Sequence, residues 1–276
     1  MIVLKFGGTS VGTLEKVRDS ATIIMQQPFP RAAVVSAASG VTNLLLEAAA
    51  NSAEGDQEAA DQVVALIVEK HHTIAQGIAE EHRTAALALL DQLHAALRDS
   101  LGEVAAAGEL DREHSDRIVS TGEKAMSVMM AAVLRSEGAP ASHVWADRVI
   151  ATDDRFGNAR PDRDRTRLQA QEVVLPLLAA GETVVMTGFI GGTEDGRTTT
   201  LGRGGSDYSA TLLGAAVDAD EVQIWTDVPG VLSADPRQVP EARVVPIISY
   251  EEAQELAHFG AKVLHPRTIR PAVARN

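Results

Sequence analysis

Short apolar runs and longer amphipathic segments alternate along most of the chain. The apolar runs are five or six residues long and lie at Met1–Phe6, Arg31–Ser36, Ala141–Trp145, Thr183–Thr187 and Glu221–Thr226. Runs of this kind are typical of strands that are buried on both faces of a parallel sheet. The segments between them repeat apolar residues every three or four positions, as helices do; examples are Leu14–Gln26, Arg163–Ala180 and Ser249–Phe259, with a last helix from about Pro266. This alternation predicts an α/β fold with a largely parallel sheet covered by helices on both faces.

A helix-rich stretch interrupts the alternation. It comprises Glu58–Ala79, Glu81–Ala107 and Ser115–Ser136, which we expect to form a helical cap beside the sheet. Gly122 lies inside this stretch, where a glycine costs about 1 kcal/mol relative to alanine, and it indicates close approach of a ligand or another backbone. Glu123 would then face that gap and would require an ammonium group or an arginine. The alternative is an ordinary helix glutamate.

The segment Leu201–Ala216, with the sequence LGRGGSDYSATLLGAA, is the strongest candidate for a binding site. Gly204 and Gly205 allow positive φ and close approach of a ligand to the backbone. Ser206 or Asp207 is the predicted N-cap of the helix that follows. The start of that helix would attract an anion, and Arg203 adds a fork suited to a carboxylate or phosphate. Asp207 would repel an anion unless a metal, a lysine or a substrate ammonium group offsets it; a capped helix after a glycine-rich connection is the alternative.

Two further turns bring glycines next to a lysine. Lys5 ends the first strand before Gly7-Gly8, and Lys262 follows Gly260. Neither of the two commonest nucleotide fingerprints, GxGxxG and GxxxxGK[ST], is present at the first turn. A third turn, SAASGVTN at Ser36–Asn43, contains Thr42, which is an N-cap, a ligand hydroxyl or both. Because the carboxyl ends of parallel strands meet at one edge, these turns predict a site for phosphoryl transfer, which needs positioning and charge neutralisation.

Composition narrows the classes of protein. The chain has 276 residues and a net charge of −13, which argues against a nucleic-acid partner. It has no strongly apolar run long enough to span a bilayer and no signal-peptide pattern at its start, so we expect a cytoplasmic enzyme without a membrane partner. Zero cysteines exclude thiolate chemistry and cysteine-ligated metals. The histidines of the helical stretch (His71, His72, His82, His94 and His114) are interpreted as surface or packing residues, and no protein metal ligand is predicted.

The motifs together resemble the aspartokinases, in the amino-acid-kinase fold family. The sequence KFGGTSVG at Lys5–Gly12 is similar to their N-terminal signature. Five further blocks follow in order: Ser36–Asn43, Thr121–Glu123, Gly202–Tyr208, Trp225–Arg237 and Phe259–Pro266. The resemblance implies a three-layer α/β/α sandwich with a mainly parallel central sheet, and a helical insertion at about Glu47–Asp111. It also implies phosphorylation of the β-carboxylate of L-aspartate by ATP, the reaction that leads to lysine, threonine and methionine.

The resemblance also implies roles for individual residues. Lys5 and Asp207 would be catalytic, with Lys5 neutralising the transferred phosphoryl group and Asp207 organising the lysines. Glu123 would bind the aspartate ammonium and Arg203 the α-carboxylate, and the pocket would be completed by Thr42, Gly204, Gly205 and Ser206. The ATP side would comprise Gly7, Gly8, Thr226, Asp227, Leu232, Arg237, Lys262 and Val263. Mg²⁺ would arrive with ATP, held by phosphate oxygens.

Two departures from the family pattern bear on these expectations. Leu232 stands where many aspartokinases have a tyrosine near the nucleotide, and the chain stops at Asn276, where the family usually continues into ACT regulatory domains. We therefore expect residues 1–276 to form one catalytic domain with no regulatory domain, either excised or naturally short. Another amino-acid or carbamate kinase of the same fold and a non-catalytic nucleotide-binding subunit are the alternatives. The oligomeric state stays open, with a homo-oligomer among the alternatives.

Overall fold

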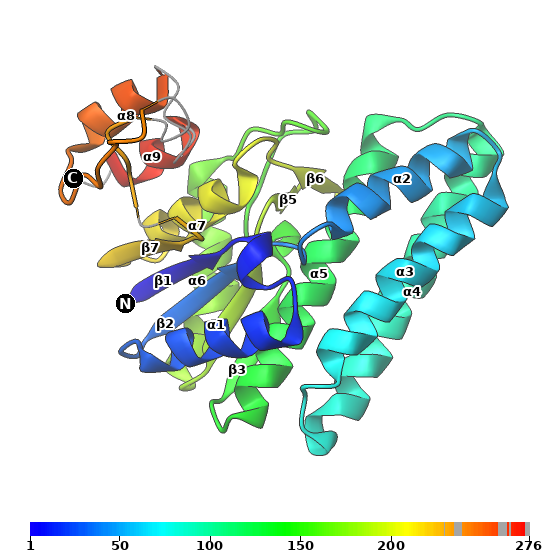
Figure 1. Ribbon diagram of the computed structural model, residues 1–276, viewed down its shortest axis with the longest axis horizontal. Helices are drawn as coiled ribbons and strands as arrows, with labels where there is room; N and C mark the ends of the chain where they lie inside the picture. The colour runs from blue at the N-terminus through cyan, green and yellow to red at the C-terminus, as the bar shows by residue number, and fades with distance from the viewer. Residues whose placement is uncertain (229, 235–238, 259–263, 265, 274–276) are drawn as a thin grey trace.

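A five-stranded parallel sheet lies at the centre of the fold, with the strand order β3-β4-β2-β1-β7 (Figure 1). The strands are β1 (Ile2–Phe6), β2 (Arg31–Val35), β3 (Ala141–Val144), β4 (Thr183–Thr187) and β7 (Glu221–Trp225). All four strand pairs are parallel, as the apolar runs predict. The computed structural model describes residues 1–228, 230–234, 239–258, 264 and 266–273.

The two faces of the sheet bury different helices, because successive side chains of a strand point to opposite faces. Leu4, Phe6 and Val35 belong to a core shared with α1 (Leu14–Gln26) and α5 (Arg112–Ser136). Val3, Val34 and Met186 belong to a second core shared with α6 (Arg163–Ala179) and α7 (Gly205–Ala216). Two helical layers with a sheet between them form the three-layer α/β/α sandwich that the resemblance implies, so that prediction is confirmed.

The helical insertion projects to one side of the sandwich (Figure 1). It contains α2 (Val41–Ala53), α3 (Gln57–Ala75) and α4 (Glu80–Ala107). The expectation that the helix at Ser115–Ser136 belongs to this cap is wrong, since α5 also packs directly on β3 and β4. The reason is that α5 is buried on nearly every side from Ile118 to Leu134, which is the pattern of a core helix.

A hairpin and the last helices complete the described structure. Glu194–Arg197, whose sequence EDGR is typical of a hairpin turn, joins β5 (Ile190–Gly192) to β6 (Thr198–Thr200), and the two strands are antiparallel. Ser249 and Glu252 form a capping box at the start of α8 (Tyr250–His258), with reciprocal bonds of 2.9 and 3.2 Å. The predicted helix end at Phe259 lies outside the described residues. The last described helix is α9 (Pro266–Val273), and no helix in the described chain combines the length and apolar character needed to cross a bilayer.

Candidate active site

A cavity of about 570 Å³ lies beyond the carboxyl ends of the central strands. Its walls are the turn after β1, the turn after β2, one residue after β4, the start of α7 and one side chain of α5. The lining residues are Lys5, Gly7, Gly8, Ser36–Gly40, Thr42, Asn43, Glu123, Phe189 and Gly202–Asp207. The structure therefore brings together all eight residues predicted to be catalytic or substrate-binding, together with Gly7 and Gly8 of the predicted ATP side.

The first two turns pack tightly against each other because of their glycines. A Cβ on Gly8 would lie 3.0 Å from the carbonyl oxygen of Ala37, and a Cβ on Gly7 would lie 3.3 Å from Lys5 Nζ. The backbone N–H of Ser39 donates to the carbonyl of Gly8 at 3.1 Å. The glycines thus allow the two turns, and the Lys5 ammonium group, to approach closely at one wall of the cavity.

The start of α7 differs from the sequence prediction. Gly204 is the N-cap, with a φ of 71°, and no side chain caps the helix, so the prediction of Ser206 or Asp207 as N-cap is wrong. Both residues instead lie in the first helical turn, because the left-handed Gly204 turns the chain into the helix two or three residues earlier than predicted. Gly205 has an ordinary φ, but a Cβ there would lie 2.6 Å from the Phe189 ring.

A second helix also begins at the cavity. The N-cap of α2 is Gly40, with a φ of 84°, so Thr42 is not the N-cap, and its partly buried side chain lines the cavity in the first turn. The backbone N–H groups of a first helical turn lack intrahelical acceptors, and the dipole makes that end positive. The cavity between the starts of α2 and α7 is therefore suited to an anionic ligand.

Lys5 and Asp207 form an ion pair in the wall of this cavity. Lys5 Nζ lies 2.6 Å from Asp207 Oδ1, and the two side chains are only 12% and 16% exposed. Lys5 comes from the end of β1 and Asp207 from the first turn of α7, where a carboxylate is favoured by the helix dipole. A lysine thus offsets the Asp207 carboxylate, which is one of the three ways that the sequence left open.

Glu123 reaches the same cavity from α5 and is almost fully buried. Its Oε1 accepts a hydrogen bond from the backbone N–H of Ala37 at 3.2 Å, whereas Oε2 has no partner among the described residues. Burial raises the pKa of Glu123 to about 8, because a desolvated carboxylate is disfavoured. A Cβ on Gly122 would lie 2.7 Å from that of Ala37, so Gly122 marks the close approach of another element, as predicted.

The remaining predicted residues lie at the rim of the cavity or beyond it. Arg203 is exposed at the rim and makes no hydrogen bond or ion pair with any described residue. Thr226 and Asp227 follow β7, whose register sets Trp225 beside Phe6, so they lie at the same sheet edge but outside the cavity lining. Leu232 bridges to Val244 in a short antiparallel contact. The predicted nucleotide contacts Arg237, Lys262 and Val263 lie outside the described residues.

Several lining residues were not among the predicted site residues. They are Ser36–Gly40, Asn43, Phe189 and Gly202. The turn after β2 had been singled out by its small residues, but only Thr42 was chosen from it. Phe189 has a φ of 67°, which is unusual for a residue with a Cβ, and its N–H donates to Ser209 Oγ at 2.9 Å. The sequence feature that could have indicated Phe189 is Gly188, the glycine that directly follows β4.

This sheet-edge cavity, with paired and unpaired charges between two helix N-termini of an α/β fold, is suited to anionic ligands. The chain belongs to the amino acid kinase family, whose model matches residues 1–276. The lysine-sensitive aspartokinase 3 of Escherichia coli (strain K12) is 39% identical over 284 residues, which cover 99% of this chain and 59% of that protein. The aspartokinase of Chlamydia muridarum (strain MoPn / Nigg) is 35% identical, with 99% of this chain and 58% of that protein covered.

Solved structures agree with this assignment. The crystal structure of E. coli aspartokinase III in complex with aspartate and ADP has a TM-score of 0.91 and 37% identity, covering 99% of this chain and 60% of that one. An isopentenyl phosphate kinase, at 16% identity and a TM-score of 0.51, shares the fold alone. The chain thus spans less than two thirds of the length of these aspartokinases.

Proposed function

We propose that this chain transfers the γ-phosphoryl group of ATP to the β-carboxylate of L-aspartate, giving ADP and 4-phospho-L-aspartate. The observation that carries the proposal is the cavity, in which a Lys–Asp pair, a buried carboxylate with an unpaired oxygen and an unpaired arginine meet. These groups match the charges of a zwitterion with a second carboxylate beside a polyphosphate. The aspartate and ADP held by the similar E. coli aspartokinase III support the same choice.

The amino acid would lie between Glu123 and Arg203. An ammonium group near Glu123 Oε2 would supply the partner that this oxygen lacks and would lower the pKa of the carboxyl. The exposed guanidinium of Arg203 would bind the α-carboxylate as a bidentate pair. Thr42 and the turn from Gly204 to Ser206 line the space between these two ends and would complete the pocket.

The reaction would take place beside Lys5. An oxygen of the substrate β-carboxylate forms a bond to the γ-phosphorus, and the bond to the oxygen that bridges to the β-phosphorus breaks, leaving its electron pair on ADP. An ionised carboxylate needs no deprotonation, so Asp207 would hold Lys5 in position instead of acting as a base. Lys5 and the positive starts of α2 and α7 would neutralise charge on the moving group.

The nucleotide would approach along the β1–β7 edge of the sheet. Gly7 and Gly8 would contact its phosphates, with Thr226, Asp227 and Leu232 nearby; the proposal extends by resemblance to Arg237, Lys262 and Val263. Of the described residues, only two carboxylates line the cavity: Asp207 is paired with Lys5, and Glu123 is the proposed ligand of the substrate ammonium group. This donor set fits a Mg²⁺ ion that keeps phosphate and water oxygens as its ligands.

The wider setting belongs to the same proposal. Residues 1–276 would act as one catalytic domain with the helical insertion at about 47–111 inside it. The reaction would open the biosynthesis of lysine, threonine and methionine in the cytoplasm.

An ADP-release assay with Mg-ATP and a panel of acceptors tests the function directly. The expected result is turnover with L-aspartate and little with L-glutamate, carbamate or N-acetylglutamate, with trapping of the acyl phosphate by hydroxylamine as a check on the product. Preference for another acceptor would instead indicate a different kinase of the family. Thermal stabilisation by Mg-ATP alone, without turnover, would indicate a nucleotide-binding module.

A further inference from the structure

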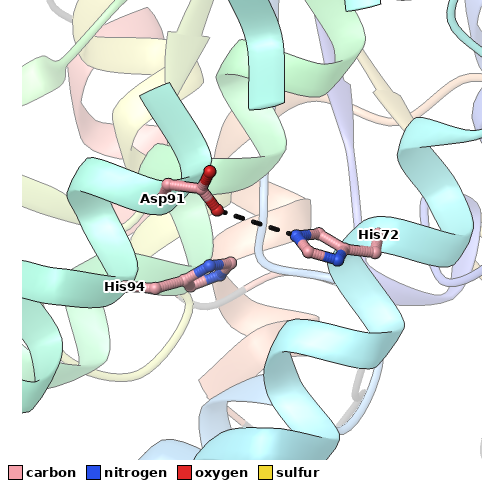
Figure 2. Close-up of side chains that lie close together, drawn as sticks. All are labelled: His72, Asp91 and His94. Carbon is pink, nitrogen blue, oxygen red and sulfur yellow. Dashed lines mark ion pairs between the residues drawn. The ribbon is translucent and has the colours of Figure 1, made fainter. Parts of the chain in front are cut away.

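Three side chains of the helical insertion point toward one another from two adjacent helices, α3 and α4 (Figure 2). They are His72 of α3 and Asp91 and His94 of α4, and one nitrogen or oxygen atom from each lies within 4.8 Å of the others. His72 Nε2 is 3.8 Å from Asp91 Oδ1. None of the three lines the cavity described above, so this cluster has no part in the proposed reaction.

His94 is buried and holds a free ring nitrogen. Its Nε2 lies 2.9 Å from Nδ1 of the equally buried His71, and the two rings stack with centroids 5.2 Å apart. Nδ1 of His94 has no hydrogen-bond partner among the described residues. When the Nε2–H of His94 donates to His71 Nδ1, the neutral His94 ring has its lone pair on Nδ1. A buried polar atom without a partner is rare and calls for an occupant.

We propose that His72, Asp91 and His94 bind a divalent transition-metal ion, of which Zn²⁺ is the best match. Two imidazoles and one carboxylate are ligands that Zn²⁺ accepts, with water in the remaining position. Zinc–ligand distances of about 2.0–2.2 Å at tetrahedral angles place ligand atoms about 3.3–3.6 Å apart. The separations of up to 4.8 Å must therefore close by about 1 Å or slightly more, and the side chains of His72 and Asp91, at 45% and 69% exposed, are free to rotate inward.

His71 is a positioning residue for this site. Its bond to His94 Nε2 occupies one ring nitrogen and fixes the orientation of the ring, as the outer partners of metal-bound histidines do. Asp91 and His94 are three positions apart, so they lie on one face of α4. The sequence interpretation of these histidines as surface or packing residues missed the cluster, because two of its members lie about twenty residues from the third.

A bound ion would join α3 to α4 in the middle of the insertion. Lys70 of α3 donates to the carbonyl of Ser39 at 2.7 Å, and Ser39 lines the cavity. The metal site would therefore fix the helix that supports the turn after β2. Its presence and affinity are independent of the reaction proposed above.

Isothermal titration of Zn²⁺ into the chelator-treated full chain, with a parallel thermal-denaturation series, tests the site. The expected result is saturable binding of one ion per chain and a rise in Tm that EDTA reverses. His72→Ala and Asp91→Ala should each weaken binding at least about tenfold, and because both side chains are exposed the variants should keep the fold, as circular dichroism will show. His82→Ala is the matched control. His82 lies on α4, as Asp91 does, but its Nε2 is 3.4 Å from Oε1 of Glu81, outside the cluster, so this variant should leave Zn²⁺ binding unchanged.

NMR of the histidine rings gives a second measurement that needs no variant. Zn²⁺ should shift the ring resonances of His72 and His94 and leave those of His82 in place. The absence of saturable binding up to about 1 mM Zn²⁺, or unchanged affinity in a His72→Ala/Asp91→Ala double variant, would overturn the proposal.

Discussion

Among the described residues, two buried lysine–aspartate pairs are nearly equal in geometry but differ in surroundings. Lys5 and Asp207 lie 2.6 Å apart at the cavity, with side chains 12% and 16% exposed. Lys124 and Asp147 lie 2.8 Å apart near the β5–β6 hairpin, with side chains 14% and 13% exposed. Distance and burial alone would give the two pairs the same role.

The residues around each pair distinguish the two. Lys124 Nζ donates to Thr198 Oγ1, which donates in turn to Asp147 Oδ2, and the ammonium group lies 5.2 Å from the centre of the Trp145 ring. In the described structure Lys5 and Asp207 form an ion pair only with each other, and both line the cavity. Lys124, Thr198 and Asp147 are hydrogen-bonded to one another, so we call Lys124–Asp147 the closed pair and expect it to stabilise the fold. Lys5–Asp207 faces the cavity and can still donate to a ligand or accept from one, so we call it the open pair.

The largest effect that this comparison predicts is on catalysis. Lys5→Ala and Asp207→Ala should each lower kcat by about 10²–10³, the usual result of removing one preorganised charge contact. Lys124→Ala is the matched control and should keep kcat per folded molecule close to the parent value. ADP-release kinetics on samples with confirmed circular dichroism measure this. Near-normal kcat in either cavity variant would refute the assignment of the two pairs.

The guanidinium of Arg203 is also available to a ligand, because it has no partner among the described residues. Arg203→Ala should raise the KM for aspartate about 10- to 100-fold, because a hydrogen bond to a charged group contributes about 1.5–3 kcal/mol. Initial-rate kinetics with each substrate varied in turn measure both KM values. If the KM for ATP rises instead, Arg203 belongs to the nucleotide side.

Removing Lys124 from the closed pair should lower the free energy of unfolding. Lys124→Met leaves Asp147 without its counter-ion, and an unsatisfied buried group costs about 1–3 kcal/mol. For a chain of this size each kcal/mol corresponds to about 2–4 °C in Tm. Thermal denaturation should be measured for this variant and for Lys5→Met, and we expect Lys5→Met, in the open pair, to lower the Tm less. Equal losses would show that enclosure does not distinguish the pairs.

The buried carboxyl of Glu123, at the same cavity, predicts a dependence of stability on pH. Its pKa is raised from 4.5 to about 8 by burial, so the folded state holds this proton more tightly than the unfolded chain. Its stabilising contribution is complete below about pH 4.5 and is lost as the pH rises through 8. Glu123→Gln removes this titration, so its Tm relative to the parent should rise between about pH 5 and pH 9 in the absence of ligand. A constant difference across that range would show that Glu123 is not buried in its acid form.

Much of this architecture was predictable from local pattern. The apolar runs predicted all five strands of the central sheet, and the glycine turns predicted that Lys5 and the start of α7, with Asp207, meet at one edge. Glu123 was assigned to the same site only through the family resemblance. These inferences work because a parallel sheet collects the ends of its strands at one edge. The residues that were missed are of another kind: Ala37 and Phe189 line the cavity through backbone position and close packing, which residue type does not reveal.

Contacts between distant segments were also beyond the sequence. Nothing local distinguishes Lys5, which has one partner across the chain, from Lys124, which belongs to a closed network. The N-cap of α7 was misassigned by two or three residues because Gly204 and the side chains of Ser206 and Asp207 are all acceptable caps, and the sequence does not show that Gly204 adopts the left-handed conformation. The histidine cluster depends on the alignment of two long helices.

Two helix glycines differ in what surrounds them, and the smallest effect predicted here is that of Gly102→Ala. Gly122 of α5 backs the cavity, where an added Cβ would lie 2.7 Å from that of Ala37 and 3.2 Å from Val41. Gly102 of α4 has nothing within 4 Å of an added Cβ. Gly122→Ala should therefore destabilise the protein by about 1–3 kcal/mol through overpacking and raise the KM for aspartate. Gly102→Ala should stabilise it by about 0.5–1 kcal/mol through helix propensity alone, without changing KM. Chemical denaturation and initial rates on both variants measure these effects, and stabilisation by Gly122→Ala would mean that the turn behind the cavity has room to move.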